Sequence, residues 1–270
     1  MCRLLGYVAA KPTSVVSLLG PEAFETFTEL SAVHGDGWGM AWDVHGEILT
    51  QSAPNAAVSD VTYRDLASIA LSDAGLVHLR WATDGHRVEP TNTHPFTAGG
   101  LALAHNGAIR PVDRLHDMLS DRAREALRGS TDSEQYLQYV LDRIEAVGDE
   151  AAGIRDAVER LGRTFTTSSL NAIILSPEAL YAVHVNSGAE PPVGDLRQMF
   201  GSDERMPIGH ATAYYSLAYR VDDHGFEVIS TGIDPMGWTP VPHDSMLRVD
   251  LATRAVEITE LDLVPVAARR

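Results

Sequence analysis

The sequence predicts an α+β protein made of two sheets with helices between or outside them. Short apolar runs bounded by turn residues dominate the first part of the 270-residue chain, and the last part returns to such runs. The middle instead shows helical spacing of apolar residues. This order of strands, helices and strands is typical of a layered α+β domain. Because no linker interrupts the chain, we expect one domain over residues 1–270.

Five runs in the first part alternate or cluster apolar residues as strands do. They are residues 3–10, 37–43, 46–52, 75–83 and 100–106. The pair His45-Gly46 separates the second run from the third and predicts a hairpin turn there. A short helix is expected over residues 63–71.

Three helices are predicted in the middle of the chain. The first covers residues 112–127 and ends before Gly129. The second begins at Thr131, because Thr131 and Glu134 have the spacing of a capping box. The third covers residues 150–161. The strands expected after them are residues 170–176, 179–186, 211–220, 226–231, 246–251 and 255–261.

The charge balance argues against several kinds of partner. The chain has 21 basic and 37 acidic residues, a net charge of −16. Proteins that bind nucleic acid or anionic membranes need the opposite sign, so we expect neither partner. No apolar run reaches the roughly 18–20 residues that span a bilayer, and the N-terminus has no secretory signal pattern. We therefore expect a cytoplasmic protein.

The common phosphate, zinc and serine-hydrolase motifs are missing. Residues 35–39, GDGWG, contain glycines without the spacing of a dinucleotide-binding loop. No Walker A, HExxH or GxSxG motif is present. Four histidines, His78, His86, His94 and His105, are close in sequence, but their spacing matches no zinc pattern, which favours structural roles. We expect no metal and no cofactor.

The one cysteine of the chain, Cys2, follows the initiator methionine. A single cysteine is most often a small buried apolar residue. The alternative is an N-terminal nucleophile. Removal of Met1, favoured by the small side chain that follows it, would place a thiol and an α-amine on one residue. The α-amine titrates near 7.7–8.0, so it can carry a proton near neutral pH without a histidine.

Three further positions have both a structural and a catalytic interpretation. Arg80 near a strand end is either a surface arginine or a clamp for a carboxylate. Asn106-Gly107 is either a turn or an oxyanion hole made of an amide N–H and a backbone N–H. Asp132 is either a first-turn helix acid or a carboxylate for a substrate ammonium. Together with Cys2 they describe a pocket for an amino acid.

The sequence resembles the class II glutamine amidotransferases, which belong to the N-terminal-nucleophile (Ntn) hydrolases. The matching pieces occur in the family's order over about the first half of the chain: MC (1–2), HGDGWG (34–39), HLRWATDG (78–85), THPF (93–96), AHNGAI (104–109) and TDSE (131–134). The later half resembles the family in pattern only. The serine-glutamate-proline string usual there is replaced by Ser230-Thr231-Gly232.

The resemblance implies a four-layer α-β-β-α sandwich with two antiparallel sheets and a donor that is glutamine or another γ-glutamyl amide. Cys2 would attack the side-chain amide and form a γ-glutamyl thioester, which water hydrolyses to glutamate. By motif match, Asn106 and Gly107 would form the oxyanion hole and Asp132 would bind the α-amine. Arg80 and Thr83 would hold the α-carboxylate, with Trp81 and His94 shaping the pocket and residues 36–39 forming a turn beside it.

After these motifs the chain has only enough residues to finish the same sandwich, so we expect no synthase domain in it. The leading hypothesis is a stand-alone amidohydrolase of this family. A second is a glutaminase subunit that supplies ammonia to a separate synthase. A third is a non-catalytic glutamine-binding sensor, against which the N-terminal position of Cys2 argues.

Overall fold

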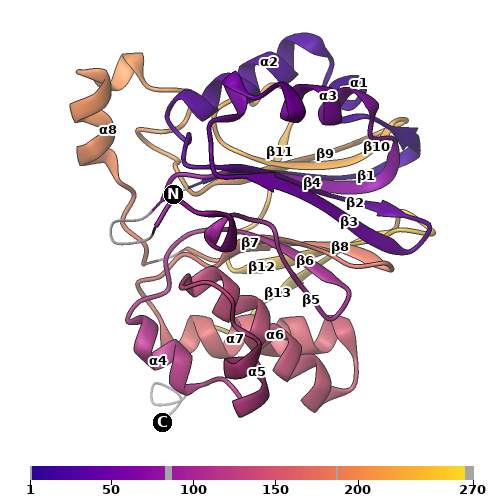
Figure 1. Cartoon of the computed structure of the whole chain (residues 1–270), viewed down its shortest axis with the longest axis vertical. Coiled ribbons are helices and arrows are strands. Elements are labelled where there is room, and N and C mark those ends of the chain that lie inside the picture. The colour runs from indigo at the N-terminus through magenta and orange to yellow at the C-terminus, as the bar shows by residue number, and fades with distance from the viewer. Residues whose placement is uncertain (1, 83–86, 187, 265–270) are drawn as a thin grey trace.

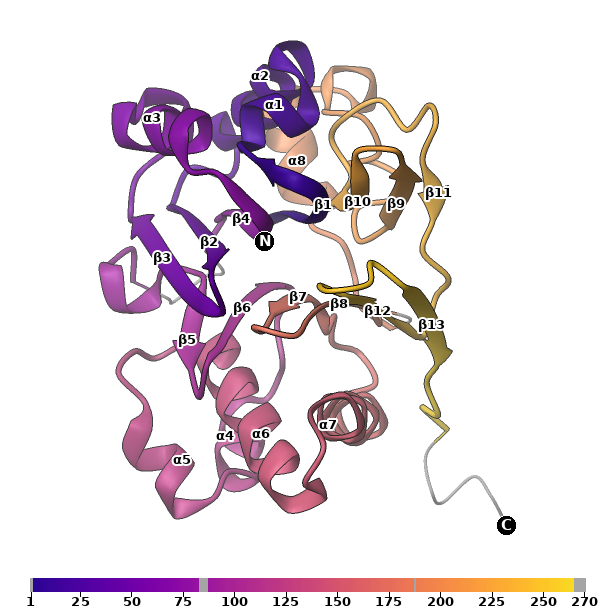
Figure 2. The same ribbon diagram turned by 90° about the vertical axis from the view of Figure 1, so that its right-hand side faces the viewer.

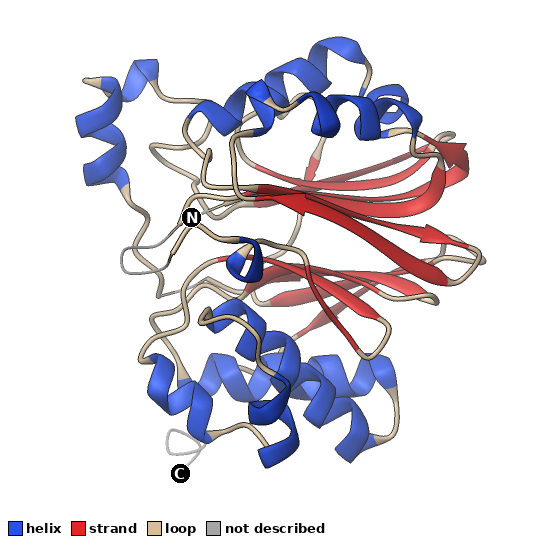
Figure 3. Cartoon of the chain, in the orientation of Figure 1, coloured by secondary structure: helices blue, strands red, loops and turns tan. Residues whose placement is uncertain are grey.

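The computed structural model describes residues 2–82, 87–186 and 188–264. They form two antiparallel sheets stacked face to face, with helices on the outer face of each (Figures 1 and 3). The predicted α+β class and the four-layer α-β-β-α sandwich are therefore confirmed.

The first sheet has seven strands in the order β11-β9-β10-β1-β4-β2-β3. Strand β1, which begins one residue after Cys2, is the middle strand, between β10 and β4. The strands are β1 (Arg3–Thr13), β2 (Trp38–Val44), β3 (Glu47–Ala53), β4 (Ser72–Leu79), β9 (Leu217–Asp222), β10 (Gly225–Ser230) and β11 (Thr239–Pro240).

The second sheet has six strands in the order β13-β12-β8-β7-β6-β5. Strand β6, which ends at Asn106, pairs with β7 through the register Asn106 to Asn171. The strands are β5 (Phe96–Ala98), β6 (Leu101–Asn106), β7 (Asn171–Leu175), β8 (Ala179–His184), β12 (Ser245–Asp250) and β13 (Val256–Glu260).

The helices form the outer layers. Figure 2 shows α1 (Val15–Leu19), α2 (Pro21–Glu29) and α3 (Val61–Ile69) over the first sheet. The second sheet is covered by α4 (Val112–Asp117), α5 (Asp121–Ala126), α6 (Asp132–Val147) and α7 (Glu150–Thr164). Between the sheets lies a dry apolar layer that includes Leu4, Ile173 and Leu247, and burial of these side chains from water drives the two sheets together.

Two predicted elements differ from the structure. The helix expected over residues 112–127 is two helices, because the Ser120 hydroxyl accepts from Ala123 N and starts α5. The strand expected over residues 211–220 begins only at Leu217. Before it, the carbonyls of Tyr214 and Tyr215 accept from the side chains of Arg3 and Asn171 instead of joining a sheet.

The start of α6 is partly as predicted. Thr131 is its N-cap, and the Thr131 hydroxyl accepts from Glu134 N at 3.2 Å. The return bond of a capping box does not form, because the Glu134 carboxylate accepts from the backbone N–H groups of Arg128 and Gly129. Glu134 therefore holds the preceding loop against the helix that carries Asp132.

Five helices and strands were not predicted: α1, α2, the short strands β5 and β11, and α8 (Val193–Phe200). Helix α8 belongs to a segment that leaves the sandwich beside the N-terminus (Figure 1). This segment has a small core of its own around Leu196 and Met206, which packs against Trp81. None of the helices in the described part of the chain is long and apolar enough to cross a membrane.

The close approach of β2 to the segment before β5 yields a stability prediction. A Cβ at Gly39 would lie 2.0 Å from the His94 carbonyl oxygen, which is backbone and cannot move aside alone. Gly39→Ala is therefore expected to lower the free energy of unfolding by about 1–3 kcal/mol. Urea denaturation measures it, with Gly194→Ala in α8 as the matched control, since nothing lies within 4 Å of a Cβ there. Equal urea midpoints for the two variants would contradict this packing.

Candidate active site

Cys2 is buried where the two sheets meet, immediately before the middle strand of the first sheet. Its backbone nitrogen donates to Oδ1 of Asn106, at 2.8 Å. In the described structure this nitrogen is a peptide N–H, because Met1 precedes it in the chain. Removal of Met1 would turn the same atom into the α-amine. The bond therefore holds the nitrogen that would become the amino terminus against the end of β6 in the second sheet.

Asn106 is fully buried at the end of β6. Its backbone carbonyl accepts from the Ser169 hydroxyl at 2.9 Å, which fixes the strand end. With Oδ1 occupied by Cys2 N, the side-chain nitrogen Nδ2 is left buried without a hydrogen-bond partner among the described residues. A buried amide that keeps a free donor beside a thiol is ready to bind an oxygen of a ligand.

Gly107 follows Asn106 in a place where only glycine fits. A Cβ there would lie 2.0 Å from the Ser169 carbonyl oxygen and 2.7 Å from Nε2 of His105. Gly107 also lines the pocket that contains Cys2. The absence of a side chain leaves its backbone accessible to a molecule in that pocket.

Arg80 and Trp81 follow the end of β4, the neighbour of β1. The guanidinium of Arg80 is buried and donates at 3.3 Å to the carbonyls of Asp36 and Arg87. The Asp36 carboxylate accepts from Ala82 N at 2.8 Å. The turn expected over residues 36–39 is shorter in the structure, because Trp38 and Gly39 belong to β2, but Asp36 before this strand holds the loop after β4. Thr83 lies outside the described residues.

Asp132 is the first residue of α6 and is buried. One carboxylate oxygen accepts from Ile109 N at 2.5 Å, and the other accepts from Ser133 N at 3.0 Å. These two bonds connect the helix start to the loop that follows Asn106-Gly107. Each oxygen keeps a second acceptor site for a donor in the pocket.

A small pocket of about 20 Å³ brings most of the predicted site residues together. It is lined by Cys2, Arg80, Trp81, Ala82, His94, His105, Gly107, Thr131, Asp132 and Ser133. Asn106 is not part of this lining but contacts Cys2 directly. The pocket therefore has a thiol, a guanidinium and a carboxylate on its walls.

The sequence reading did not identify His78 and His105 as site residues. His105 lies between Ser133 Oγ, at 2.9 Å from Nδ1, and the Ser169 carbonyl, at 2.8 Å from Nε2. It thereby links α6 to the loop before β7. The only sequence signal was position, because His105 adjoins Asn106 and His78 precedes Arg80 by two residues.

The histidines pack against one another. The rings of His78 and His94 stack with centroids 4.0 Å apart, and His86 lies outside the described residues. In the described ranges, no three histidine, cysteine or acidic side chains form a metal-binding group. Burial above all, followed by His78, lowers the pKa of His94 well below its usual range, so His94 is neutral at pH 7. Both of its ring nitrogens lack partners within the described structure, in agreement with a wall of the pocket.

The thiol of Cys2 is unusually acidic for a buried group. Burial alone raises its pKa, but the electrostatic interactions with His78 and with the amino terminus lower it. Hydrogen bonds involving His78 and the Trp81 backbone add to this effect, and the resulting pKa is about 6. A thiol with that pKa is mostly thiolate at pH 7, which is the nucleophilic form.

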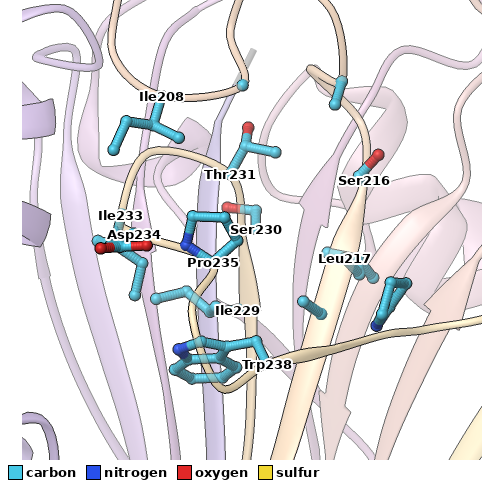
Figure 4. A pocket seen from close by; sticks show the side chains of 14 residues that line it. Ile208, Ser216, Leu217, Ile229, Ser230, Thr231, Ile233, Asp234, Pro235 and Trp238 are labelled. Atoms are coloured by element: carbon cyan, nitrogen blue, oxygen red, sulfur yellow. The ribbon is translucent and has the colours of Figure 1, made fainter.

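A second, larger pocket is separate from this site. Its volume is about 230 Å³, and apolar side chains such as Ile229, Leu217 and Trp238 line it (Figure 4). No lining residue is shared with the Cys2 pocket. Thiol, guanidinium and carboxylate groups suited to amide chemistry occur together only in the smaller of these two pockets.

Comparison with known proteins agrees with this site. Residues 1–186 match the family model of the class II glutamine amidotransferases. Glutamine–fructose-6-phosphate aminotransferase (isomerizing) of Streptomyces coelicolor is 26% identical over 246 residues, which are 90% of this chain and 38% of that protein. The enzyme of the same name from Mycobacterium tuberculosis H37Rv is 30% identical over 78% of this chain and 33% of its own length. The chain thus spans about a third of the curated relatives that it matches.

Solved structures share the fold. A glutamine aminotransferase class-II domain protein from Silicibacter pomeroyi superposes with a TM-score of 0.63 at 20% identity, over 98% of this chain and 100% of that one. Glutamine phosphoribosylpyrophosphate amidotransferase from B. subtilis has a TM-score of 0.63 at 15% identity, over 96% of this chain and 49% of that one. With the N-terminal cysteine at the site, the family match identifies the chain: it belongs to the class II glutamine amidotransferases, enzymes of the Ntn type that cleave the amide of glutamine.

Proposed function

We propose that this protein is a stand-alone, single-domain amidohydrolase in which Cys2 attacks the side-chain amide of glutamine or of another γ-glutamyl amide. The attack gives a γ-glutamyl thioester and releases ammonia or an amine, and water then releases glutamate. The observation that supports this most directly is the hydrogen bond from Cys2 N to Asn106 Oδ1. It sets the nucleophile next to an amide group whose Nδ2 is free to donate.

The free α-amine of Cys2, once Met1 is removed, is the proton carrier of the reaction. It titrates near 7.7–8.0 in its ordinary state, so it exchanges a proton readily at neutral pH. Asn106 Oδ1 orients it, as the present Cys2 N bond indicates. This arrangement places nucleophile and proton carrier on one residue, as in other N-terminal-nucleophile sites.

Asn106 Nδ2 and the Gly107 N–H are proposed as the oxyanion hole. During attack, the carbonyl oxygen of the amide gains negative charge, and preorganised N–H donors stabilise that charge. Nδ2 is buried and unpartnered among the described residues, and Gly107 has no side chain to block approach. Nδ2 need not break a bond to the described residues to take up the oxyanion.

Arg80 and Asp132 are proposed to bind the amino-acid end of the donor. The guanidinium of Arg80 suits an α-carboxylate, and the carboxylate of Asp132 suits an α-ammonium. Both line the Cys2 pocket. Trp81 and His94 form walls of this pocket, and Thr83 joins Arg80 in the same role by resemblance alone.

Loss of the charge of either Arg80 or Asp132 is expected to raise the KM for glutamine. Arg80→Gln and Asp132→Asn each remove a charge-assisted hydrogen bond worth about 1.5–3 kcal/mol, so the KM for glutamine should rise roughly 10- to 150-fold. Steady-state glutaminase assays measure it, with Arg114→Gln as the control, because Arg114 is exposed and donates only to the Thr164 carbonyl. An unchanged KM in both variants would exclude this orientation of the substrate.

A second candidate function is a glutaminase subunit that passes ammonia to a synthase partner. It is favoured by the relatives, since this chain matches about a third of the glutamine–fructose-6-phosphate aminotransferases. The stand-alone function is favoured by the Silicibacter pomeroyi protein, which the chain covers from end to end. Co-purification with a synthase that raises glutamate release would favour the subunit. Tight glutamine binding without any glutamate release would instead indicate a sensor.

The experiment that tests the proposal is the intact mass of the purified protein before and after treatment with 6-diazo-5-oxo-norleucine, a glutamine-shaped electrophile. We expect loss of Met1 and a single adduct on Cys2. Such an adduct needs both a reactive thiol and a pocket for a γ-glutamyl group. A processed protein that takes up no adduct and releases no glutamate from glutamine would contradict the proposal.

A further inference from the structure

The cavity shown in Figure 4 lies at the edge of the first sheet that β11, β9 and β10 form. Its volume is about 230 Å³. All three strands contribute to its wall, together with the loop around Ile208 after α8 and the loop around Trp238 after β10. In the view of Figure 4, Ile208 and Trp238 lie at opposite ends of the cavity. The cavity is therefore built by a different part of the fold from the Cys2 pocket.

Hydrogen bonds and close packing hold the two loops in place. In the first loop, Ala213 N donates to the Gly209 carbonyl at 2.8 Å. In the second, Trp238 N donates to the Pro235 carbonyl at 3.0 Å. Gly209 also approaches the end of β10 so closely that a Cβ there would lie 2.9 Å from the side chain of Thr231. The cavity is thus formed before any ligand binds, which lowers the entropy cost of binding.

The inner surface of the cavity is mostly apolar, and two of its hydroxyl groups already have partners. Ser230 Oγ accepts from Leu4 N at 2.9 Å. Thr231 Oγ1 accepts from Arg3 Nη1 at 2.6 Å. Such a cavity offers few partners to water but favourable contacts to an apolar group, and an apolar cavity of about 150 Å³ in another protein binds benzene. The present volume suits a benzene ring with a short side chain.

Asp234 is the one charged residue among those that line the cavity. It is exposed, so its carboxylate lies where the cavity meets the solvent. Oδ1 accepts from Met236 N at 2.9 Å, which fixes the position of the carboxylate. A carboxylate has about four acceptor sites, so it can still accept from a cation bound in the cavity.

Two arginines lie close to the cavity, but neither of them lines it. The guanidinium of Arg220 lies 4.7 Å from the centre of the Trp238 ring, and its charge is paired with Glu227 at 2.9 Å. Arg3 is fully buried and donates to Thr231, the residue that does line the cavity. The charge that a bound molecule meets directly is therefore the negative charge of Asp234.

We propose that this cavity is a binding site for a small organic cation with a compact apolar body. The apolar body, an aromatic ring or a branched alkyl group, lies inside against Ile229 and Trp238. Its removal from water supplies most of the binding free energy. The ammonium group lies at Asp234, where solvent still reaches it, so little of its hydration is lost. This site is independent of the proposed reaction, because it shares no residue with the Cys2 pocket.

The test uses 2-phenylethylamine as the probe, with 2-phenylethanol and 3-phenylpropionate as its neutral and anionic counterparts. Isothermal titration calorimetry of the full chain at pH 7 measures the three affinities. We expect the amine to bind with a Kd of about 0.1–1 mM, more tightly than the alcohol and far more tightly than the carboxylate. No measurable binding of the amine up to about 10 mM would overturn the proposal. Binding of the carboxylate as tight as that of the amine would overturn it too.

Two substitutions locate the binding in this cavity. Asp234→Asn should weaken the binding of the amine roughly 2- to 10-fold and leave that of the alcohol unchanged. Ala218→Leu adds three carbons to a residue that lines the cavity and should abolish the binding of both, with the urea midpoint as the check that the protein is folded. Undiminished binding in folded Ala218→Leu protein would place the ligand elsewhere and reject the site.

Asp222→Asn is the matched control for Asp234→Asn. Asp222 is also exposed, and its Oδ1 accepts from the backbone nitrogen two residues later, as that of Asp234 does. It does not line the cavity. The control should bind the amine as the unchanged protein does. Equal affinities for the amine in Asp234→Asn and Asp222→Asn would refute the role of Asp234, whether or not Ala218→Leu folds.

Discussion

Replacement of Cys2 by alanine is expected to reduce glutamate release from glutamine to the background rate. The thiol is the only group in the pocket that can form the γ-glutamyl thioester, because it is the one cysteine of the chain. Its pKa of about 6 makes it a thiolate at pH 7. Coupled assay of glutamate, or of ammonia, measures the loss.

Alanine at this position should leave the fold intact. Cys2 lies before β1 rather than inside it, and the Asn106 bond uses the backbone nitrogen, which alanine retains. The urea midpoint of Cys2→Ala should therefore be close to that of the unchanged protein. Glutamine should still bind, because Arg80 and Asp132 are untouched. A folded Cys2→Ala protein with substantial turnover would remove Cys2 from the mechanism.

Retention of Met1 should also abolish turnover, because it changes the nitrogen of Cys2 rather than its sulfur. With leucine inserted after Met1, the nitrogen of Cys2 stays a peptide N–H and has no basic lone pair. It can still donate to Asn106 Oδ1 but cannot carry a proton to the leaving nitrogen. Turnover is lost while iodoacetamide still alkylates Cys2. Normal turnover in this variant would show that the α-amine is dispensable.

The sequence predicted the elements that carry the site better than the elements around it. Strands β1, β4 and β6 and the start of α6 have clear local signals. Cys2 precedes β1 and Arg80 follows β4, while β6 ends at Asn106 and α6 begins at Asp132. The hydrogen bond from Cys2 to Asn106 joins residues 104 positions apart. No local pattern specifies such a pairing, so the complementary chemistry of these residues suggested one pocket and the resemblance to a family assigned their roles.

The segment before β9 was predicted wrongly because its backbone bonds to distant side chains. Residues 211–216 are rich in alanine and tyrosine and look like a strand. In the structure, Arg3 donates to the Tyr214 carbonyl and Asn171 to the Tyr215 carbonyl. These buried donors compete with a sheet partner for the same oxygens. Local strand propensity does not reflect hydrogen bonds that side chains far away in the sequence make to the same carbonyl oxygens.

His78 was missed because its contacts come from parts of the chain that are distant in sequence. In sequence it is one of several histidines without metal spacing. In the structure its Nε2 lies 3.3 Å from the His105 carbonyl oxygen, and its ring stacks on that of His94. That carbonyl lies on the second sheet, whereas His78 lies on the first. The packing of the two sheets therefore determines the surroundings of this ring.

Substitution of Asn106 should cost nearly as much activity as loss of the thiol itself. Asn106→Ala removes Nδ2, the proposed oxyanion donor, together with Oδ1, which orients Cys2 N. Loss of one such donor typically lowers kcat roughly 10²- to 10³-fold. Because two functions are lost at once, the fall should lie at the upper end of that range. Steady-state kinetics with glutamine measure it, and KM should change much less than kcat.

Asn106→Asp separates the two functions of the side chain. One oxygen of the aspartate can still accept from Cys2 N, while the other replaces the donor Nδ2 by an acceptor that repels an oxyanion. If the N–H donation to the oxyanion matters more than the orientation of Cys2 N, Asn106→Asp should have a kcat no higher than that of Asn106→Ala. The matched control is Asn171→Ala, because Asn171 is the buried cross-strand partner of Asn106 and its side chain bonds to the backbone of Tyr215 and Val185. Asn171→Ala should lower the stability of the protein and leave kcat within a few fold of the unchanged protein. Near-normal kcat in Asn106→Asp would mean that the oxyanion is stabilised by other groups.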